Sequence, residues 1–281
     1  MIVTRFAPSP TGLLHLGHAY AAWIAHDSGD DFLLRMEDLD QGRSRDAFIE
    51  AMYCDLKWLG LSWDEPVLRQ SRRSVAYAEA LQSLGARGLT YPCFCTRKEI
   101  ADEIARAGQA QHFDVWPPLG AGAGAGPDGP LYPGTCRHLP ADQDLSRPHV
   151  LRLDAAKAAA LAGPLTFTEH GAVQAVDPLR FGDIVLARKD LPAAYHLAVV
   201  VDDAFQNVSL VTRGEDLLPA THVQRLLQAL LDLPEPAYAH HTLILDEKTG
   251  KKFSKRDQAV TLASLREAGA TPSDIRARVG L

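Results

Sequence analysis

The chain has few cysteines, no long apolar run and no excess of positive charge, and each shortage excludes a class of protein. Four cysteines are spread unevenly over 281 residues, unlike the disulfide framework of a small secreted domain. No stretch approaches the roughly 20 apolar residues of a membrane span. The first ten residues lack the apolar segment of a signal peptide. We therefore expect a cytoplasmic protein that does not bind a membrane.

The charge balance is slightly acidic. A formal net charge of −6 argues against a protein that coats nucleic acid through a global positive field, although it allows a local basic groove. Hydrophobic residues make up 46% of the chain, which is typical of a protein with a buried core. The length suits one large domain with an insert, or two modest domains.

The spacing of apolar residues predicts alternating strands and helices. In the first half we expect strands at 2–6 and 32–36, and helices at 17–26, 46–59 and 74–84. This order predicts a parallel α/β sheet. In the second half we expect buried strands at 197–201 and 208–211, and a helix at 221–231.

The middle of the chain has a different composition. It contains three of the cysteines and a Gly/Ala-rich tract at 120–129, which cannot bury a core and is predicted to be a flexible loop. We therefore expect four parts: the first half of a catalytic domain, an insert, the second half of that domain, and a segment with a lysine-rich loop. They cover residues 1–90, 91–180, 181–235 and 236–281.

The tetrapeptide His15-Leu16-Gly17-His18 lies where a turn leads into a predicted helix. A helix N-terminus offers free backbone N–H groups and a partial positive charge, which suit a phosphate. Gly17 allows a nucleotide to approach the backbone closely. His15 and His18, three residues apart, share a helical face and can donate hydrogen bonds to phosphate oxygens. The turn predicts a nucleotide site, with two unrelated surface histidines as the alternative.

A basic loop, Lys251-Lys252-Phe253-Ser254-Lys255-Arg256, lies near the end of the chain. Its lysines can hold a leaving pyrophosphate and offset charge in a transition state. By itself the loop could be a solvated run of charge. The two elements together favour a nucleotide site much more strongly than either one.

These segments are similar to the signatures of a known enzyme family. Residues 5–12 (RFAPSPTG), 15–18 (HLGH) and 252–255 (KFSK) resemble those of class I aminoacyl-tRNA synthetases. Three further segments resemble the glutamyl branch of this family: residues 35–40 (RMEDLD), 198–203 (AVVVDD) and 213–216 (RGED). The resemblance implies the family fold: a Rossmann-like, doubly wound parallel sheet, split by a zinc-containing connective insert, with ligands at the carboxyl ends of the strands.

The resemblance also implies a glutamate site. Arg5 and Arg213 would bind the side-chain carboxylate, because arginine forms bidentate, charge-assisted bonds. Glutamine would be rejected, since a neutral amide leaves buried guanidinium charge unpaired. Glu37 would bind the α-ammonium. The other implied glutamate-binding residues are Phe6, Ala7, Pro8, Ser9 and Tyr195.

The implied reaction is an in-line attack by the glutamate α-carboxylate on the α-phosphorus of ATP. Such chemistry depends on positioning and charge stabilisation more than on a general base. The implied catalytic residues are His15, His18 and Lys255, with Mg²⁺ on the phosphates. The implied ATP-binding residues are His15, Gly17, His18, Lys252, Ser254 and Lys255.

Three cysteines of the insert predict a metal site. Cys93, Cys95 and Cys136 plus one further ligand would make a closed tetrahedral zinc site. The spacing leaves His138 or His112 open as the fourth ligand, and three free buried cysteines are the alternative. The resemblance implies Tyr132 instead, because short glutamyl-type chains carry a Cys-x-Cys and Tyr-x-x-x-Cys pattern. The remaining Cys54 is interpreted as structural.

The acceptor is suggested by the short stretch after the basic loop. Only residues 257–281 follow it, too few for a helical anticodon-reading module. The chain therefore resembles the glutamyl-queuosine tRNA(Asp) synthetases, truncated members of the branch that have no anticodon-binding domain. This implies tRNA-independent activation of glutamate, then transfer to the cyclopentenediol of queuosine in the anticodon of tRNA(Asp). We expect a monomer that binds the anticodon stem-loop.

Three other functions stay open. The chain could be the catalytic core of a conventional glutamyl-tRNA synthetase. It could be a catalytically silent paralogue that binds RNA, although the intact His15, His18, Lys255, Arg5 and Arg213 argue against this. It could also be a nucleotidyltransferase of the same fold that acts on a small molecule.

The lysine-rich loop generates a first prediction. Lys255→Ala should leave glutamate binding largely intact but slow adenylate formation strongly, because the loop stabilises charge only as pyrophosphate leaves. Glutamate-dependent ATP–pyrophosphate exchange measures this step, and an unchanged exchange rate in the variant would refute the role of Lys255.

Overall fold

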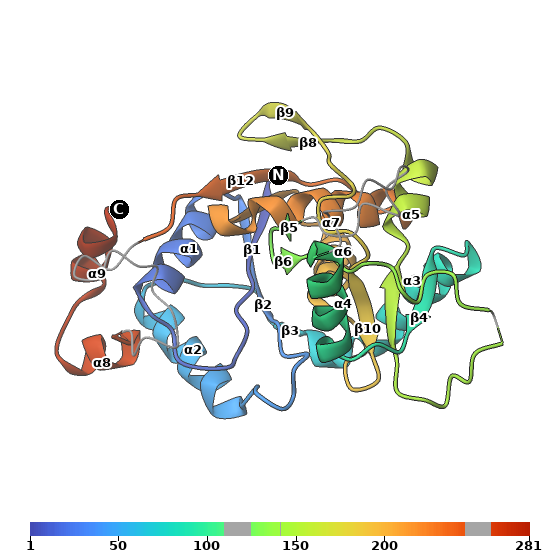
Figure 1. Cartoon of the computed structure of the whole chain (residues 1–281). Coiled ribbons are helices and arrows are strands. Elements are labelled where there is room, and N and C mark those ends of the chain that lie inside the picture. The colour runs from blue at the N-terminus through green and yellow to red at the C-terminus, as the bar shows by residue number, and fades with distance from the viewer. Residues whose placement is uncertain (110–124, 141, 245–259) are drawn as a thin grey trace.

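A computed structural model describes residues 1–109, 125–140, 142–244 and 260–281 of the chain (Figure 1). The predicted basic loop, with Lys252, Ser254 and Lys255, lies outside these residues, as does His112. No helix in the described parts is both long enough and apolar enough to cross a bilayer.

The N-terminal half of the sheet is parallel. Strands β1 (Val3–Phe6), β2 (Asp31–Met36) and β3 (Leu68–Arg69) pair in the order β1-β2-β3. Helix α1 (Leu16–Asp27) connects β1 to β2, and helix α2 (Asp46–Trp58) lies between β2 and β3 in the chain. Trp23 of α1 and Met52 of α2 are almost fully buried in the core that covers these strands.

A second group of strands extends the sheet beyond β1. Strands β11 (Leu210–Gly214), β12 (Ala237–His241) and β8 (Thr166–Glu169) are parallel, and β9 (Ala172–Ala175) adds an antiparallel edge. The groups meet at β1, because the Ser209 N–H donates to the Val3 carbonyl over 3.0 Å. From this junction β2 and β3 follow β1 outward on one side and β12 follows β11 outward on the other, so β1 and β11 flank a topological switch point. The expected doubly wound parallel sheet is confirmed.

Three helices build a second core. They are α3 (Ser74–Ala86), α6 (Tyr195–Phe205) and α7 (Leu218–Leu230), which bury Tyr77, Leu197 and Leu226 against one another. Residues 197–201 therefore form part of a helix, and the predicted strand is wrong. The five residues are all apolar, and periodicity cannot separate a buried strand from a buried helix in such a short run.

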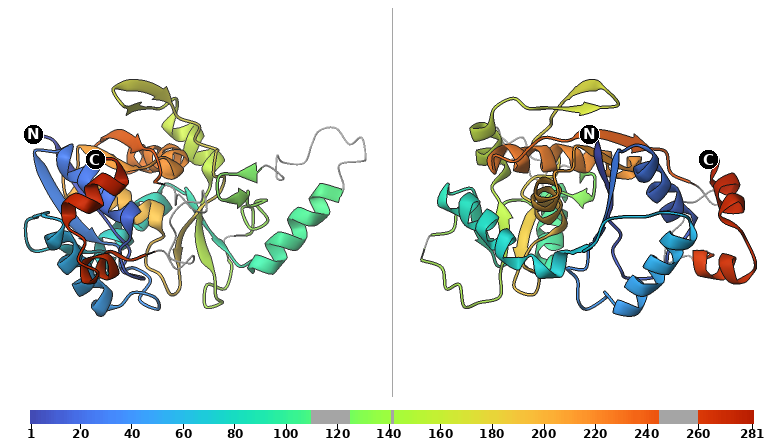
Figure 2. Two further views of the ribbon diagram at one scale, coloured as in Figure 1. Left: turned by 90° about the vertical axis from the view of Figure 1, so that its left-hand side faces the viewer. Right: turned by 180° about the vertical axis from the view of Figure 1, so that it is seen from behind.

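The middle of the chain contains a separate, antiparallel sheet of β4 (Thr90–Cys93), β7 (Val150–Leu153) and β10 (Val185–Arg188). Helix α4 (Arg97–Gln109) follows β4 and projects away from the rest of the described chain (Figure 2). Helix α5 (Ala155–Ala162) follows β7. The expected part boundaries at 90, 180 and 235 stay a prediction.

Part of the expected flexible loop is ordered. Residues 125–130 form a hairpin of β5 (Ala125–Gly126) and β6 (Gly129–Pro130), and only 120–124 of the predicted loop lie outside the described residues. Pro127 and Asp128 make its two-residue turn, and Gly129 has φ +116°, a conformation that other residues rarely adopt. Turn chemistry of this kind overrides a low-complexity composition.

The C-terminal helices pack on the first half of the fold. Helices α8 (Leu262–Glu267) and α9 (Pro272–Val279) lie beside α2 and α1, at one end of the molecule (Figure 1). The Arg276 guanidinium lies 4.7 Å from the Trp23 ring centroid, and Arg266 donates to Asp55 over 2.7 Å. Short 3-10 turns at Gln70–Arg72 and Glu215–Leu217 complete the described elements.

Two consecutive aspartates of α6 connect the halves of the fold. Asp202 is fully buried and accepts hydrogen bonds from Gln70 over 2.9 Å, Arg73 over 3.0 Å and Tyr77 over 2.7 Å. Burial and the neighbouring Asp202 carboxylate raise the pKa of Tyr77, so its hydroxyl stays a donor. Asp203 faces β1 and β2, as described below.

The buried carboxylate generates a second prediction. Tyr77→Phe removes one donor to Asp202, and the free energy of unfolding should fall by about 2 kcal/mol, the usual size for a bond to a charged acceptor. Denaturant unfolding measures the change. The matched control is Tyr53→Phe, because the Tyr53 hydroxyl bonds no described residue and its ring packs on Trp63. Equal losses in both variants would contradict the role of Asp202.

Candidate active site

The switch point between β1 and β11 places the predicted histidine turn at the N-terminus of α1. His15 is the N-cap residue, and its backbone N–H donates to His18 Nδ1 over 3.1 Å. The two imidazole centroids are 3.8 Å apart. A Cβ at Gly17 would lie 3.2 Å from His15 Cε1, tighter than an ordinary contact. The structure therefore brings His15, Gly17 and His18 together at a helix end suited to phosphate.

Both flanks of the basic loop lie beside this turn. Before the loop, Ile244 packs against the core around α1, and the His241 ring contacts Tyr20 edge-on at 5.0 Å. After the loop, Thr261 forms a bridge with His15, and the Leu262 N–H donates to the Leu14 carbonyl over 2.8 Å. The described residues on both sides of the basic loop thus lie close to the histidine turn.

Asp203 holds two buried arginines at the carboxyl ends of β1 and β2. Its Oδ1 accepts from Arg5 Nε over 3.0 Å and from Arg35 Nη1 over 2.7 Å. Arg5 Nη1 also reaches the Thr212 carbonyl on β11 over 3.2 Å. Burial opposes ionisation of Asp203, but Arg5 and Arg35 outweigh it and lower the pKa of Asp203. This carboxylate is therefore ionised and fixes the Arg5 side chain.

Glu37 lies beside this ion pair, at the end of β2. Its Oε1 is 3.4 Å from Arg35 Nη2, and its backbone N–H donates to the Pro8 carbonyl over 3.1 Å. Burial raises the pKa of Glu37, although Arg35 and Arg5 act in the opposite direction. Among the other predicted residues, Phe6 is a core residue at the end of β1.

Arg213, on β11, is buried and bonded only to neutral groups. It donates to Gln224 Oε1 over 2.7 Å, Thr221 Oγ1 over 2.8 Å and His240 Nε2 over 3.0 Å. No carboxylate among the described residues forms an ion pair with it, and the ion pair with Glu215 or Asp216 that its sequence position allows is not formed. A buried guanidinium without a carboxylate is a ready partner for an anionic ligand.

A cavity of about 550 Å³ opens beside Glu37. Ser9, Glu37 and Tyr195 line it, together with His196. A second cavity of about 850 Å³ shares Tyr195 and His196 as a common wall. Burial and the nearby Arg213 charge lower the pKa of His196 to about 4, so a neutral imidazole separates the two cavities.

Sequence reasoning did not identify several groups that complete the site. These are Gln70 on the cavity wall and the partners of Arg213, namely Thr221, Gln224 and His240. They are separated from the motifs along the chain and carry no local pattern. Asp203 and Arg35 could have been found from the sequence, because both lie inside the segments that resemble the glutamyl branch.

The predicted metal ligands converge in the middle of the chain. The sulfurs of Cys93, Cys95 and Cys136 all lie within 4.8 Å of one another, with Cys95 and Cys136 3.4 Å apart. A tetrahedral zinc with bonds of about 2.3 Å requires sulfur separations of about 3.8 Å, so the cluster fits zinc. The Tyr132 hydroxyl lies 3.3 Å from Cys93 Sγ and 3.6 Å from Cys95 Sγ.

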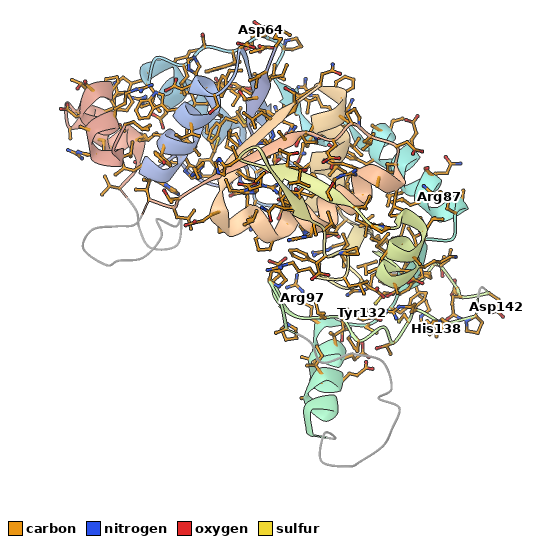
Figure 3. The ribbon with its side chains drawn as sticks, turned by 90° about the horizontal axis from the view of Figure 1, so that it is seen from above. Asp64, Arg87, Arg97, Tyr132, His138 and Asp142 are labelled. Atoms are coloured by element: carbon orange, nitrogen blue, oxygen red, sulfur yellow. The ribbon has the colours of Figure 1, made fainter. Side chains whose placement is uncertain are left out.

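The environment of the thiols favours a cation. Burial, the hydrogen bond to Cys136 and the neighbouring sulfurs raise the pKa of Cys95 to about 12, against a hydrogen bond from Tyr132. A divalent ion would reverse this repulsion by holding the sulfurs as thiolates. Tyr132 and His138 lie on the same side of the molecule (Figure 3), but His138 does not lie close enough to the three sulfurs to join the group that could hold a metal. The geometry therefore favours Tyr132 over His138 beside the three sulfurs.

The chain belongs to the class I tRNA synthetases of the glutamate and glutamine branch, because the catalytic-domain model of that family matches residues 1–280. It is accordingly a ligase-type enzyme that uses ATP. The fold, the histidine turn and the switch-point site described above agree with this assignment.

Within that family the chain is similar to glutamyl-Q tRNA(Asp) synthetases. It is 46% identical to the one from Rhodobacter capsulatus over an alignment of 295 positions that covers 100% of both chains. The relative from Nocardia farcinica is 45% identical over 97% of this chain and 82% of its own. A crystal structure of a glutamate tRNA ligase from Elizabethkingia meningosepticum with its amino acid superposes with a TM-score of 0.74 at 28% identity, covering 96% of this chain and 58% of that one.

The cysteine cluster generates a third prediction. Protein purified without chelator should contain about one zinc per chain, and Cys136→Ser should lose most of it, because three thiolates are needed to close the site. The control is Cys54→Ser, which alters the exposed Cys54 outside the cluster and should keep its metal. Elemental analysis measures the zinc content of the native protein, Cys136→Ser and Cys54→Ser. A metal-free native protein would contradict the zinc site.

Proposed function

We propose that the enzyme activates glutamate with ATP and transfers it to queuosine in the anticodon of tRNA(Asp). The similarity to glutamyl-Q tRNA(Asp) synthetases along the whole chain supports the acceptor. The state of Arg213 supports the amino acid, and it is the single observation on which the choice of glutamate depends.

Arg213 selects a carboxylate. Its three neutral partners fix the guanidinium but leave the charge without a counter-ion among the described residues. A glutamate carboxylate would supply that charge, and the nearby Arg5 can share it because its own position is fixed by Asp203. Glutamine would leave the guanidinium charge unpaired, and the resulting desolvation cost is the basis for rejecting it.

Glu37 is proposed to bind the α-ammonium. It lines the 550 Å³ cavity beside Ser9 and Tyr195, whose hydroxyls can add hydrogen bonds. Burial alone disfavours an ionised Glu37, and a bound ammonium would restore the carboxylate. Phe6, Ala7 and Pro8 are proposed to support this site, because the Pro8 carbonyl accepts a hydrogen bond from the Glu37 backbone N–H.

ATP is proposed to bind at the turn of His15 to His18. Backbone N–H groups at the start of α1 and the two imidazoles would hold the phosphates, and Mg²⁺ would offset part of their charge. The flanks of the basic loop lie beside this turn, which supports Lys252, Ser254 and Lys255 as partners of the leaving pyrophosphate. Glutamate would attack the α-phosphorus in line, and glutamyl-adenylate would remain bound.

Transfer is proposed to follow at the same site. A hydroxyl of the queuosine cyclopentenediol attacks the carbonyl carbon of glutamyl-adenylate, AMP leaves, and an ester forms. Zinc held by Cys93, Cys95, Cys136 and Tyr132 would stabilise the middle of the chain, whose Tyr132 lines the same cavity as Glu37. The metal would therefore shape the wall that the RNA meets.

A second function is favoured by one observation. The superposition with a glutamate tRNA ligase supports a conventional acceptor, the 3′ end of tRNA(Glu). Both functions require the same adenylate, so only the acceptor distinguishes them.

The acceptor generates a fourth prediction. With labelled glutamate, ATP and total tRNA, the label should appear on tRNA(Asp) that contains queuosine, and nuclease digestion should place it on the anticodon fragment. Queuosine-free tRNA should stay unlabelled, because the attacking hydroxyl is absent. Label on queuosine-free tRNA(Glu) would reject the proposed acceptor.

A pair of variants tests the choice of glutamate in the same assay. Arg213→Met should lower kcat/KM for glutamate at least about 30-fold, because losing one partner of a buried charge pair costs about 2 kcal/mol or more. Arg225→Met removes a matched arginine that pairs with Glu235 at 2.8 Å, away from the cavities, and should leave the rate unchanged.

A further inference from the structure

The third partner of Arg213 is itself held by a carboxylate. His240, on β12, accepts from Arg213 Nε at its Nε2, 3.0 Å away. On the opposite edge of the ring, His240 Nδ1 lies 2.7 Å from Glu169 Oε2, at the end of β8. Glu169 Oε1 also accepts the His240 backbone N–H over 2.9 Å. One carboxylate thus holds both the ring and the backbone of His240.

The turn between β8 and β9 adds further hydrogen bonds to the backbone around His240. His170 has φ +46° at the tip of the β8–β9 hairpin, and its Nε2 donates to the His240 carbonyl over 2.9 Å. Its backbone N–H donates to the Tyr238 carbonyl over 2.9 Å. His240 is therefore fixed at its backbone nitrogen, its backbone oxygen and its ring.

These contacts determine which ring nitrogen carries the proton. A carboxylate accepts hydrogen bonds only, so Nδ1 must be the donor towards Glu169. In a neutral imidazole the other nitrogen is then an acceptor, as the Arg213 N–H requires. The Thr221 hydroxyl, 3.5 Å from Nε2, meets the same lone pair.

We infer that Glu169 and His240 are positioning residues that set the orientation of the Arg213 guanidinium for a carboxylate substrate. The inference rests on the proposed function, because it gives Arg213 a glutamate to bind. Gln224 and Thr221 each take one N–H from the terminal nitrogens, and His240 takes the N–H of Nε. One N–H on each terminal nitrogen is left for the ligand.

The arrangement depends on a neutral His240. Burial and the positive charge of Arg213 lower the pKa of His240, and Glu169 acts against them. The groups that face the ring are Glu169 from β8, His170 from the turn, Arg213 from β11, Thr221 from α7 and Tyr238, whose ring stacks 6.1 Å away. Protonation at Nε2 would direct a second N–H at Arg213 and displace the guanidinium.

The sharpest variant is Glu169→Gln. Both carboxylate oxygens of Glu169 accept a hydrogen bond, whereas an amide has one oxygen and one NH₂. With the NH₂ facing Nδ1, the ring proton moves to Nε2 and opposes the Arg213 N–H. His240→Phe removes the acceptor outright, and His240→Gln can return one through its side-chain carbonyl.

We expect Glu169→Gln and His240→Phe each to raise KM for glutamate at least tenfold in ATP–pyrophosphate exchange, with KM for ATP within twofold of the native value. His240→Gln should recover part of the loss. Glu235→Gln, which changes a carboxylate paired with Arg225, is the matched control and should keep both constants. Melting temperatures separate misfolding from misplacement of Arg213.

The pH profile gives a readout that a merely structural role would not move. In the native enzyme, kcat/KM for glutamate should fall on the acid side of pH 6.5, because His240 is needed neutral and its pKa lies below its usual value. The acid limb should disappear in His240→Gln. Nitrogen-15 NMR of the histidines should show His240 as the Nδ1–H tautomer in the native protein and not in Glu169→Gln.

Two results would overturn the inference. One is an unchanged KM for glutamate in folded Glu169→Gln and His240→Phe. The other is an Nε2–H tautomer in the native protein. Failure of the native enzyme to exchange pyrophosphate with glutamate would instead reject the proposed function, and the tautomer would still be measurable, so the two failures are distinguishable.

Discussion

The Asp203 carboxylate, shared by Arg5 and Arg35, is the interaction on which the site depends. It joins α6 to β1 and β2, and through Arg5 it reaches the Thr212 carbonyl on β11. Glu37 adds a second carboxylate 3.4 Å from Arg35, and the burial of Arg5, Arg35 and Asp203 makes the loss of any partner costly. The same ion-pair network therefore positions the strands and fixes the Arg5 side chain at the switch point.

The buried charge of Arg213 is stabilised differently from that of Arg35. Arg35 is fully buried and compensated by carboxylates, whereas Arg213 is buried among an amide, a hydroxyl and an imidazole. The neutral partners give it direction without cancelling its charge. A preorganised charge of this kind lowers the stability of the free protein. The lost free energy is recovered when a carboxylate binds and pairs with the guanidinium.

A second buried carboxylate connects the cysteine cluster to the cavity. Asp183 accepts from Tyr91, two residues before Cys93, and from Arg137, which follows Cys136. Its backbone carbonyl accepts from Arg152 over 2.7 Å, and Arg152 lies 3.8 Å from the Tyr132 ring centroid. Hydrogen bonds of Asp183 thus connect the segments that carry the cysteine cluster to the wall of the 550 Å³ cavity.

The sequence by itself determined the parallel sheet, the helices of the first half, the histidine turn and the three cysteines. Periodicity and glycine chemistry are local, so β1, α1, β2, α2 and α3 lie close to where the spacing predicts them. The segment at 197–201 could not be assigned this way, because its apolar residues suit a buried helix and a buried strand equally well.

Only the tertiary structure decided which side chains meet. Asp203 and Arg5 are 198 residues apart in the chain, and Glu169 and His240 are 71 apart, so no spacing rule connects them. The pairing of Arg213 with neutral groups also comes from the way β11, β12, β8 and α7 pack. Charge compensation depends on distances in space, and a sequence pattern reports only distances along the chain.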